Sequence, residues 1–561
     1  MHLISRPLAL AAALCLAACT SMAPLPAPQP PVGPVKVQVL AINDFHGNLQ
    51  PPAPFRLPDP ANPGQHLQVP VGGAESLATA VKQLRKDKAN HIFVAAGDLI
   101  GGTPLLSALF FDEPTLESLT TMGLHVSAVG NHEFDRGADE LLRRIRGGCA
   151  PKEGCRGPQP FKGTGFKYLA ASTVDTRTGQ TLLPAYHVQA FEGVPVAFIG
   201  LTLKGTPGLV MPEAVAGLRF DDEAETINRL VPELQAQGVQ AIVVLIHEGG
   251  FPSGGPNECP AISGPIVDIV KRMHAAVDVV VTGHTHRAYN CRLEGKLVTS
   301  GDKFGSMVTE IELSLDRNSR DVLEAKAQNH LVRLDQYGKD PEQTQLLAAY
   351  QSLARPLIER AVGRLSKEVP HGRADEAGNW PMGYIVADAH LAATRAPEQG
   401  GAQLAFTNTG GVRAGLSFKD GGRINFGDLF TAQPFNNQLV TLTLRGADLL
   451  ELLEQQWRAD GQYYPLQPSQ GFSYRWDAKR PLGQRVLPDS VLVQGEPLDP
   501  ARDYRLTVNS FIASGGDGYP ALKKGRDSRL GVLDIEALEA YVRSLPMVQP
   551  PAALERIQRV N

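Results

Sequence analysis

Short apolar runs alternate with segments of helical periodicity between Val35 and about residue 330. The runs are rich in Val, Ile and Ala and mostly lack an alternating polar face, which is typical of strands covered on both sides. Segments 72–88 and 221–238 carry apolar residues at helical spacing. This alternation predicts an α/β fold with helices on both faces of a sheet. The predicted strands are VKVQVLAI (35–42), HIFVAAG (91–97), HVSAVG (125–130), VPVAFIGL (194–201), AIVVLIH (241–247) and VDVVVTG (277–283).

Segment 341–360 has the pattern of one long helix. Leu346, Tyr350, Leu353 and Leu357 are predicted to share its apolar face. We interpret this helix as a connector between two domains. Beyond it the patterns predict helices at 383–395 and 446–457, and strands at 403–408, 438–444 and 504–509. The expected organisation is a domain at 36–335, a helical linker and hinge at 336–361, and a second, smaller α/β domain at 362–553.

The first residues have the pattern of an export signal. A basic start at Arg6 precedes an apolar stretch that is too short to span a bilayer easily. The stretch ends in LAAC, which resembles the bacterial lipoprotein signal, in which Cys19 would become the lipidated first residue. A plain signal peptide cleaved nearby, with Cys19 incidental, is the alternative. We expect a signal peptide at 1–18 and a stiff, proline-rich tether at 19–35.

This N-terminus implies an exported protein, periplasmic or at the cell surface. Thr20 follows the cysteine, where aspartate is linked with inner-membrane retention, so we expect a lipid anchor in the outer membrane as the only membrane contact. The net charge of −4 offers no basic excess to neutralise phosphate backbones, so no nucleic acid polymer is expected as a partner. The sequence predicts no particular oligomeric state.

Four cysteines follow the signal region, and an even number in an exported chain suggests disulfides. The simplest pairing joins Cys149 with Cys155 and leaves Cys259 with Cys291. Four cysteines allow three pairings in all. A zinc cluster is the rival interpretation, although no CxxC spacing supports it.

Polar residues follow five of the predicted strands at their C-terminal ends, which is where sites form in open α/β sheets. Each alone is a weak signal, because a lone His or Asp at a strand end is usually a structural residue. Five such ends together would cluster carboxylates at a desolvation cost that metal ions relieve. The residues are Asp44 and His46, Asp98, the stretch NHEFD at 131–135, His247, and His284 with His286.

Imidazole with carboxylate suits zinc, manganese, cobalt or iron, whereas calcium and magnesium prefer oxygen ligands. Two such ions need a bridging carboxylate, and Asp98 is the expected bridge. A metal pair of this kind activates a water molecule and clamps phosphoryl oxygens. The sequence therefore predicts two divalent metal ions as cofactors.

The order NDFHG, GDLIGG, GNHEFD, H and GHTH resembles the calcineurin-like metallophosphatases. In the second half, TNTGGVR (407–413), INFGDLFTAQPFNNQLV (424–440) and NSFIASGGDGY (509–519) resemble the C-terminal domain of bacterial 5′-nucleotidases and UDP-sugar hydrolases. The resemblance implies a metallophosphatase β-sandwich with flanking helices, followed by a smaller α/β substrate-binding domain.

The resemblance also implies roles for individual residues. One metal would be held by Asp44, His46, Asp98 and His286, and the other by Asp98, Asn131, His247 and His284. His132 would face the phosphoryl group, oriented and charged by Asp135. For Glu133 we expect a hydrogen bond to a nearby loop rather than a catalytic role.

In the second domain the family's aromatic clamp for a nucleobase maps to Phe435 and Phe511. Asn437 and Asp517 match positions that contact the base or ribose, and Asn408 and Arg413 match positions near ribose and phosphate. Arginine can bind phosphate through two parallel hydrogen bonds. A further arginine usually precedes MGYIVADA, but here only Arg373 stands nearby, at unfamiliar spacing.

The expected function is metal-dependent hydrolysis of nucleoside 5′-monophosphates to nucleoside and phosphate, with UDP-sugars as a further substrate class. Two alternatives remain open. The same metal site could serve a nucleotide pyrophosphatase or a cyclic-nucleotide phosphodiesterase, or the chain could be a non-catalytic nucleotide-binding surface lipoprotein. In the family the two domains rotate to carry substrate to the metals, which places a hinge at the 341–360 connector.

Overall fold

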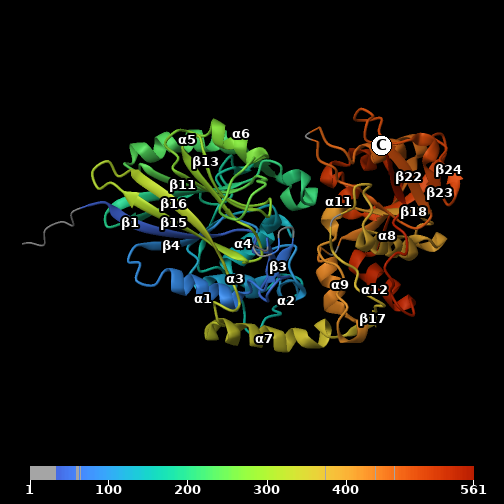
Figure 1. Cartoon of the computed structure of the whole chain (residues 1–561), viewed down its shortest axis with the longest axis horizontal. Coiled ribbons are helices and arrows are strands. Elements are labelled where there is room, and N and C mark those ends of the chain that lie inside the picture. The colour runs from blue at the N-terminus through green and yellow to red at the C-terminus, as the bar shows by residue number, and fades with distance from the viewer. Residues whose placement is uncertain (1–32, 59–61, 63–64, 373, 436, 460) are drawn as a thin grey trace, which may run out of the picture.

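The chain forms two units joined by one long helix (Figure 1). The computed structural model describes residues 33–58, 62, 65–372, 374–435, 437–459 and 461–561. The predicted signal peptide, Cys19 and nearly all of the proline-rich tether lie outside the described residues.

Two six-stranded sheets face each other in the N-terminal unit. Their buried side chains, among them Val39 of the first sheet and Val243 of the second, pack into one core between the sheets. The predicted β-sandwich is therefore confirmed. The first sheet has the order β16-β15-β1-β4-β5-β6, with β1 Val35–Ile42, β4 His91–Ala95, β5 Val126–Ala128, β6 Lys167–Leu169, β15 Met307–Leu315 and β16 Val322–Leu331. The second has the order β13-β14-β12-β11-β9-β8, with β8 Tyr186–Phe191, β9 Val194–Thr202, β11 Ala241–His247, β12 Val279–Thr282, β13 Ala288–Leu293 and β14 Lys296–Gly301.

Helices cover the outer face of each sheet, whereas the inner face packs on the other sheet. The alternating pattern predicted helices on both faces of a sheet, which is wrong for the inner faces. Helices α1 (Ala74–Leu84) and α3 (Glu113–Met122) bury Leu77 and Leu116 against the first sheet. Helices α5 (Glu223–Ala236) and α6 (Pro265–Arg272) do the same on the second sheet. Flanking helices thus explain why the central strands lack a polar face.

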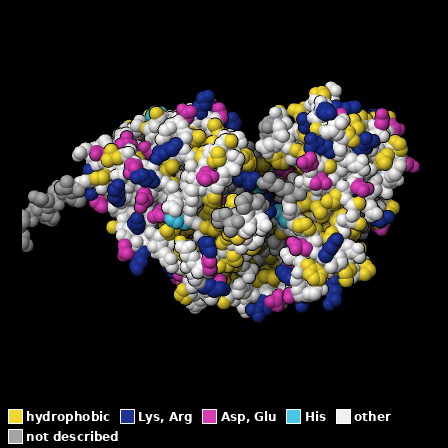
Figure 2. Space-filling view, in the orientation of Figure 1, with side chains coloured by type: hydrophobic (Ala, Val, Ile, Leu, Met, Phe, Trp, Pro, Cys, Tyr) yellow, Lys and Arg dark blue, Asp and Glu magenta, His cyan; other side chains and the backbone are white. Residues whose placement is uncertain are grey.

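The central strands of both sheets run parallel: β1 with β4 and β5 in one, and β9 with β11 and β12 in the other. Parallel strands bring their C-terminal ends to a common edge, so the loops that follow them are neighbours. This edge faces the C-terminal unit across a hollow in which histidine side chains are visible (Figure 2).

Helix α7 (Pro341–Ile358) runs beneath both units and links them (Figure 1). It begins at Asp340, whose carboxylate accepts the N–H groups of Glu342 and Gln343. The Tyr350 ring packs edge-on against Phe110, at 5.0 Å between ring centroids. The helix is thus anchored on the N-terminal unit.

The apolar face predicted for this helix is confirmed at Tyr350 and in part at Leu346, but it is wrong at Leu353. Its buried residues are Gln343, Leu347, Tyr350 and Ala354, whereas Leu353 is 52% exposed. Gln343 is buried because its side chain hydrogen-bonds Ser118 of α3. Gln343 therefore belongs to the buried face of the helix, and this face is rotated about the helix axis from the predicted leucine face.

The C-terminal unit has a five-stranded sheet of order β21-β18-β25-β20-β26 and a four-stranded sheet of order β24-β23-β22-β27. Helices α8 (Pro381–Thr394) and α12 (Asp534–Ser544) contact each other and the five-stranded sheet of this unit. Strand β27 pairs with β22, so the unit runs on to Val560, past residue 553. The strands are β18 Leu404–Thr407, β20 Gln438–Arg445, β21 Gln467–Pro468, β22 Phe472–Asp477, β23 Leu492–Val493, β24 Glu496–Pro497, β25 Asp503–Asn509, β26 Arg526–Leu533 and β27 Ile557–Val560.

The four described cysteines form two disulfides. Cys149 pairs with Cys155, and Cys259 pairs with Cys291. The second bond ties the loop before α6 to strand β13, in the core of the second sheet. Within the described ranges, every helix is too short or too polar to cross a bilayer.

Candidate active site

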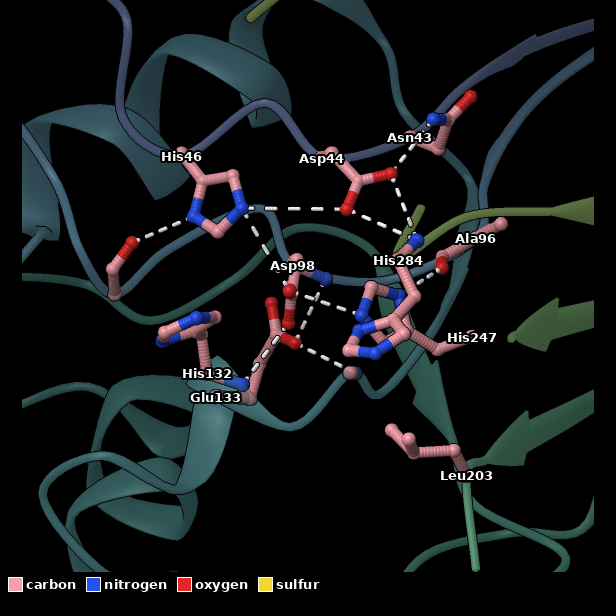
Figure 3. A network of polar contacts seen from close by, with 12 residues as sticks. Asn43, Asp44, His46, Ala96, Asp98, His132, Glu133, Leu203, His247 and His284 are labelled. Carbon is pink, nitrogen blue, oxygen red and sulfur yellow. Dashed lines mark hydrogen bonds and ion pairs between the residues drawn. The ribbon is translucent and has the colours of Figure 1, made fainter. Parts of the chain in front are cut away.

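Five loops at the C-terminal edge of the sandwich bring the predicted metal ligands together. Asp44 and His46 follow β1, Asp98 follows β4, Asn131 follows β5, His247 ends β11, and His284 and His286 follow β12. The side chains of Asp44, His46 and Asp98 converge with those of His247 and His284 (Figure 3). Asp44, His46, Asp98, Asn131 and His247 are each at most 2% exposed.

Two groups of these ligands lie on either side of Asp98 Oδ2. On one side, His46 Nε2 lies 3.6 Å from Asp98 Oδ2, and His286 Nε2 lies 3.4 Å from Asp44 Oδ1. On the other side, His247 Nε2 lies 2.9 Å from the same Asp98 oxygen. Asp44 with His46 and His286 forms one candidate metal group, and Asp98 with His247 and His284 forms another, each with ligand atoms within 4.8 Å of one another. Asp98 has the position that a bridging ligand requires.

The donor atoms fit a cation. Asn131 Oδ1 is buried without a hydrogen-bond partner, and His247 Nε2 is buried 2.9 Å from Asp98 Oδ2. Two backbone carbonyls accept the Nδ1–H groups of the imidazoles: Gly101 O for His46 at 2.7 Å and Ala96 O for His247 at 2.8 Å. These bonds select the tautomer that turns Nε2 inward, as metal-binding histidines require.

Strained backbone marks the same loops. Five of the seven ligand residues have positive φ, a conformation that costs free energy for residues other than glycine. The packed surroundings must hold this strain in place, which fixes where the side chains point. The residues are Asp44 (48°), His46 (45°), Asp98 (49°), His284 (69°) and His286 (53°).

The electrostatics of the cluster favour neutral imidazoles at three of the histidines and a charged one at His247. Burial lowers the pKa of His46 and His286 well below the usual value, and that of His284 to about 4. Burial also disfavours charge on His247, but the Asp98 carboxylate outweighs it and raises the pKa of His247 to about 10. His247 must therefore lose a proton before its Nε2 can bind a cation.

Glu133 makes the hydrogen bonds to a nearby loop that the sequence predicts. Its Oε2 accepts the N–H of Asp98 at 3.0 Å and that of Gly130 at 2.6 Å, and its Oε1 accepts the N–H of Leu99 at 2.8 Å. Burial and the neighbouring Asp98 charge raise the pKa of Glu133 to about 7. The carboxylate is fully buried, so it acts as a clamp on two ligand loops and does not face the site.

His132 and Asp135 form a hydrogen-bonded pair beside the cluster. His132 Nδ1 donates to Asp135 Oδ2 at 2.8 Å, and the imidazole packs edge-on against His46. Burial pulls the pKa of His132 down, but the carboxylates of Asp135 and Asp98 outweigh it, so the pKa is raised. A charge on this imidazole would face the ligand cluster.

A cavity of about 390 Å³ lies between the units, next to the cluster. His132 and Asn131 line one side, and Arg413 and the two predicted clamp rings, Phe435 and Phe511, line the other. Phe435 lies after helix α9 (Phe426–Ala432), and Phe511 lies on the one-turn helix α11 (Ser510–Ala513). The predicted contacts to base, ribose and phosphate thus surround one cavity; Asn408, Asn437 and Asp517 complete the set.

A hydrogen-bonded chain fixes three residues of this wall. Asn509 Nδ2 donates to Asn408 Oδ1 at 2.9 Å, and Asn408 Nδ2 donates to Asp517 Oδ2 at 2.6 Å. Burial raises the pKa of Asp517. Residue Arg373 lies outside the described residues.

Sequence reasoning missed one part of the cavity wall. Leu209, Val210 and Met211, between β9 and α5, line the cavity from the N-terminal unit. Val210 is buried in the core of that unit, which anchors the segment. Apolar residues in a loop give no signal of a chemical role, so no pattern in the sequence marked them.

Comparisons with known proteins give the same two-part description. The calcineurin-like phosphoesterase model matches residues 37–288, and the 5′-nucleotidase C-terminal domain model matches residues 361–524. Endonuclease YhcR of Bacillus subtilis is 33% identical over 91% of this chain and 40% of its own length. Cell wall protein Lmo0130 of Listeria monocytogenes is 30% identical over 87% of this chain and 64% of its own.

The chain thus spans 40% and 64% of the length of these two relatives. A solved structure matches it nearly end to end. The 5′-nucleotidase precursor from Thermus thermophilus is 27% identical, with a TM-score of 0.75 over 94% of this chain and 99% of that one. With both family models, the ligand cluster and this shared architecture in agreement, the chain belongs to the calcineurin-like metallophosphatases that carry a 5′-nucleotidase C-terminal domain.

Proposed function

We propose that the protein hydrolyses nucleoside 5′-monophosphates to nucleoside and phosphate, with UDP-sugars as a further substrate class. One observation carries the proposal: two of the predicted metal ligands, Asn131 and His284, line the same cavity as the rings of Phe435 and Phe511. A phosphate at the cluster and an aromatic base at the rings would suit the two ends of a nucleotide. The similarity to a 5′-nucleotidase precursor supports the same substrate class.

Two divalent cations would be held by Asp44, His46, Asp98 and His286, and by Asp98, Asn131, His247 and His284. When bound, they would polarise the phosphoryl oxygens and lower the pKa of a water molecule. Zinc, manganese, cobalt and iron are the candidates, because four of the seven ligands are imidazoles.

The chain's own residues would supply the remaining charge stabilisation. His132, held by Asp135 and carrying a raised pKa, would donate a charged hydrogen bond to a phosphoryl oxygen. Arg413 would approach the phosphate from the C-terminal unit, since its guanidinium lines the cavity. The base would stack between Phe435 and Phe511, each contact contributing about 1–3 kcal/mol by analogy with single-stranded nucleic acid binding.

We also propose that the protein is exported and anchored by a lipid on Cys19. The two disulfides support an oxidising compartment such as the periplasm or the cell surface. Labelling of expressing cells with radioactive palmitate tests this directly. Label retained by a Cys19→Ala variant would overturn the lipid anchor.

Phosphate release by the purified chain tests the activity. The protein is stripped with chelator, returned to Mn²⁺, Co²⁺ or Zn²⁺, and supplied with AMP, UDP-glucose, NAD, cyclic AMP or a DNA oligonucleotide. We expect the highest kcat/KM with AMP. Greater activity on cyclic AMP or NAD would favour the phosphodiesterase or pyrophosphatase alternative, and cleavage of the oligonucleotide would contradict the expectation that polymers are excluded.

A His132→Ala variant is the matched control, because it leaves the ligand set intact. Equal activity in this variant would point to a contaminating phosphatase. Absence of activity on every substrate, with metal bound, would favour the non-catalytic nucleotide-binding protein.

A further inference from the structure

Phe435 lies against the imidazole of His132. The two rings stack with centroids 5.7 Å apart and planes 15° apart. Phe435 comes from the C-terminal unit and His132 from the N-terminal unit, so this contact joins the two units at the reactive end of the cavity. The Arg413 guanidinium lies 5.8 Å from the same Phe435 ring, on the C-terminal side.

A glycine permits this approach. A Cβ at Gly102 would lie 3.2 Å from Phe435 Cε1 and 3.8 Å from His132 Cε1. Any larger residue would push the Phe435 ring away, and the positive φ of 55° at Gly102 also disfavours other residues. The loop between Asp98 and α2 (Leu105–Ala108) is thus shaped to admit a ring from the opposite unit.

Three groups hold the His132 imidazole in place. Asp135 accepts its Nδ1–H at 2.8 Å, and the His46 ring meets it edge-on at 5.0 Å. The stacked ring of Phe435 is the third. Asp135 and His46 belong to the N-terminal unit and would stay with His132 if the units moved apart, whereas Phe435 would leave.

We propose that Phe435 is a positioning residue for His132, in addition to its role in binding the base. The ring limits rotation of the imidazole, so that Nε2 points at the phosphate only when the C-terminal unit has docked. Base binding and the orientation of His132 are then coupled through one side chain. The inference rests on the proposed function, because it assigns His132 to phosphate transfer.

The test separates base binding from positioning by using a substrate without a base. Phosphate release is measured from AMP and from ribose 5-phosphate, with parent, Phe435→Leu and Phe511→Leu proteins loaded with the same metal. Phe511 is the matched comparison, since its ring lines the same cavity but has no contact of this kind with His132 among the described ring pairs. Both substitutions keep an apolar side chain at the position. The melting temperature and the metal content of each variant show whether it is folded.

With Phe435→Leu we expect kcat to fall about five- to tenfold on both substrates, the size of a lost aromatic contact. With Phe511→Leu the main effect is a higher KM for AMP, and its kcat on ribose 5-phosphate stays above that of Phe435→Leu. If Phe435→Leu raises KM for AMP while kcat matches the parent on both substrates, the positioning role is overturned.

The two levels of failure are distinguishable. A parent protein that releases phosphate from neither substrate contradicts the proposed function itself. Should ribose 5-phosphate be turned over too slowly by the parent, kcat at saturating AMP decides, because saturation removes the binding contribution of the base. Equal kcat values for parent and Phe435→Leu then overturn the inference.

Discussion

Glu133 Oε2 accepts the backbone N–H of Asp98 at 3.0 Å, which fixes the residue at the centre of the ligand cluster. The same oxygen accepts the N–H of Gly130, next to the ligand Asn131, at 2.6 Å. A carboxylate that touches no predicted metal position therefore holds two ligand loops together. On both loops Glu133 binds backbone N–H groups, so these bonds set the course of the chain; the Tyr168 hydroxyl, 3.4 Å from Oε1, is a further partner.

Glu133→Gln should weaken metal binding about 10- to 100-fold, the usual cost of losing a group that orients metal ligands. The amide nitrogen would face a backbone N–H in place of an acceptor, so at least one buried donor loses its partner. Competition with a coloured chelator measures the affinity.

Glu113→Gln is the matched control for this experiment. Glu113 is also a buried carboxylate, but it accepts a hydrogen bond from Arg143, away from the ligand loops. We expect it to lower the melting temperature and leave metal affinity in place. Equal metal affinity in the Glu133 variant and the parent would contradict the clamp.

His132→Ala should lower kcat about 10²- to 10³-fold on AMP, the range for removing a donor that stabilises transition-state charge. Asp135→Asn should have a smaller effect in the same direction, because it removes the carboxylate that raises the pKa of His132 but leaves the imidazole. Steady-state kinetics at saturating metal give kcat, and metal content shows that the cluster is intact. An Asp135→Asn protein as fast as the parent would show that the pair does not act together.

Part of the arrangement of the ligands was predictable because the central strands of each sheet are parallel. Parallel pairing brings the ends of β1 and β4, before Asp44 and Asp98, to one edge of the first sheet. His247 ends β11 in the second sheet, so its place beside them also depends on how the two sheets pack. The two-sheet arrangement itself was predicted by the resemblance and not by periodicity. Buried strands have the same apolar pattern whether their faces are covered by helices or by a second sheet.

Features that depend on contacts across the chain were not predictable. The buried face of α7 follows Gln343 and its bond to Ser118, 225 residues away, which outweighs the pattern of leucines. The cavity wall at Leu209 and Met211 depends on where an apolar loop meets the second unit. Likewise, the stacking of Phe435 on His132 depends on how the two units dock.

Removing the metals should abolish activity and lower the melting temperature. A ligand present at 100 times its dissociation constant stabilises the folded state by about 2.7 kcal/mol, so return of the cation should raise the melting temperature measurably. Mn²⁺, Co²⁺ or Zn²⁺ should act at lower concentration than Mg²⁺ or Ca²⁺, because imidazole is a poor ligand for the latter. Differential scanning calorimetry across a cation series gives the melting temperature and the concentration at which each cation raises it.

Asp98→Asn provides the control for metal removal, since the Asp98 carboxylate lies within reach of His46 on one side and of His247 on the other. We expect a much smaller thermal shift on adding cation to this variant. A full shift in the variant would place the stabilising cation elsewhere on the protein.

The stability of the sandwich should depend on pH through Asp278, which lies before β12, at the opposite end of this strand from the ligand loop that carries His284. Its Oδ2 accepts the N–H of Ile242 at 2.8 Å. Burial raises the pKa of Asp278 from 3.8 to about 7, with Asp321 adding to the rise and Lys296 opposing it.

Between pH 4 and pH 7, the folded protein therefore keeps a proton on Asp278 that the unfolded chain has released. Because the unfolded state binds fewer protons there, this group's contribution to stability falls as pH rises through that window. Asp278→Asn cannot ionise and keeps an oxygen for Ile242, so its melting temperature should rise relative to the parent from pH 4.5 to pH 8. Scanning calorimetry measures the difference in melting temperature between Asp278→Asn and the parent, with chelator present so that metal binding adds no pH dependence. A difference that stays constant across this range would mean that the Asp278 carboxyl is already ionised at pH 4.5.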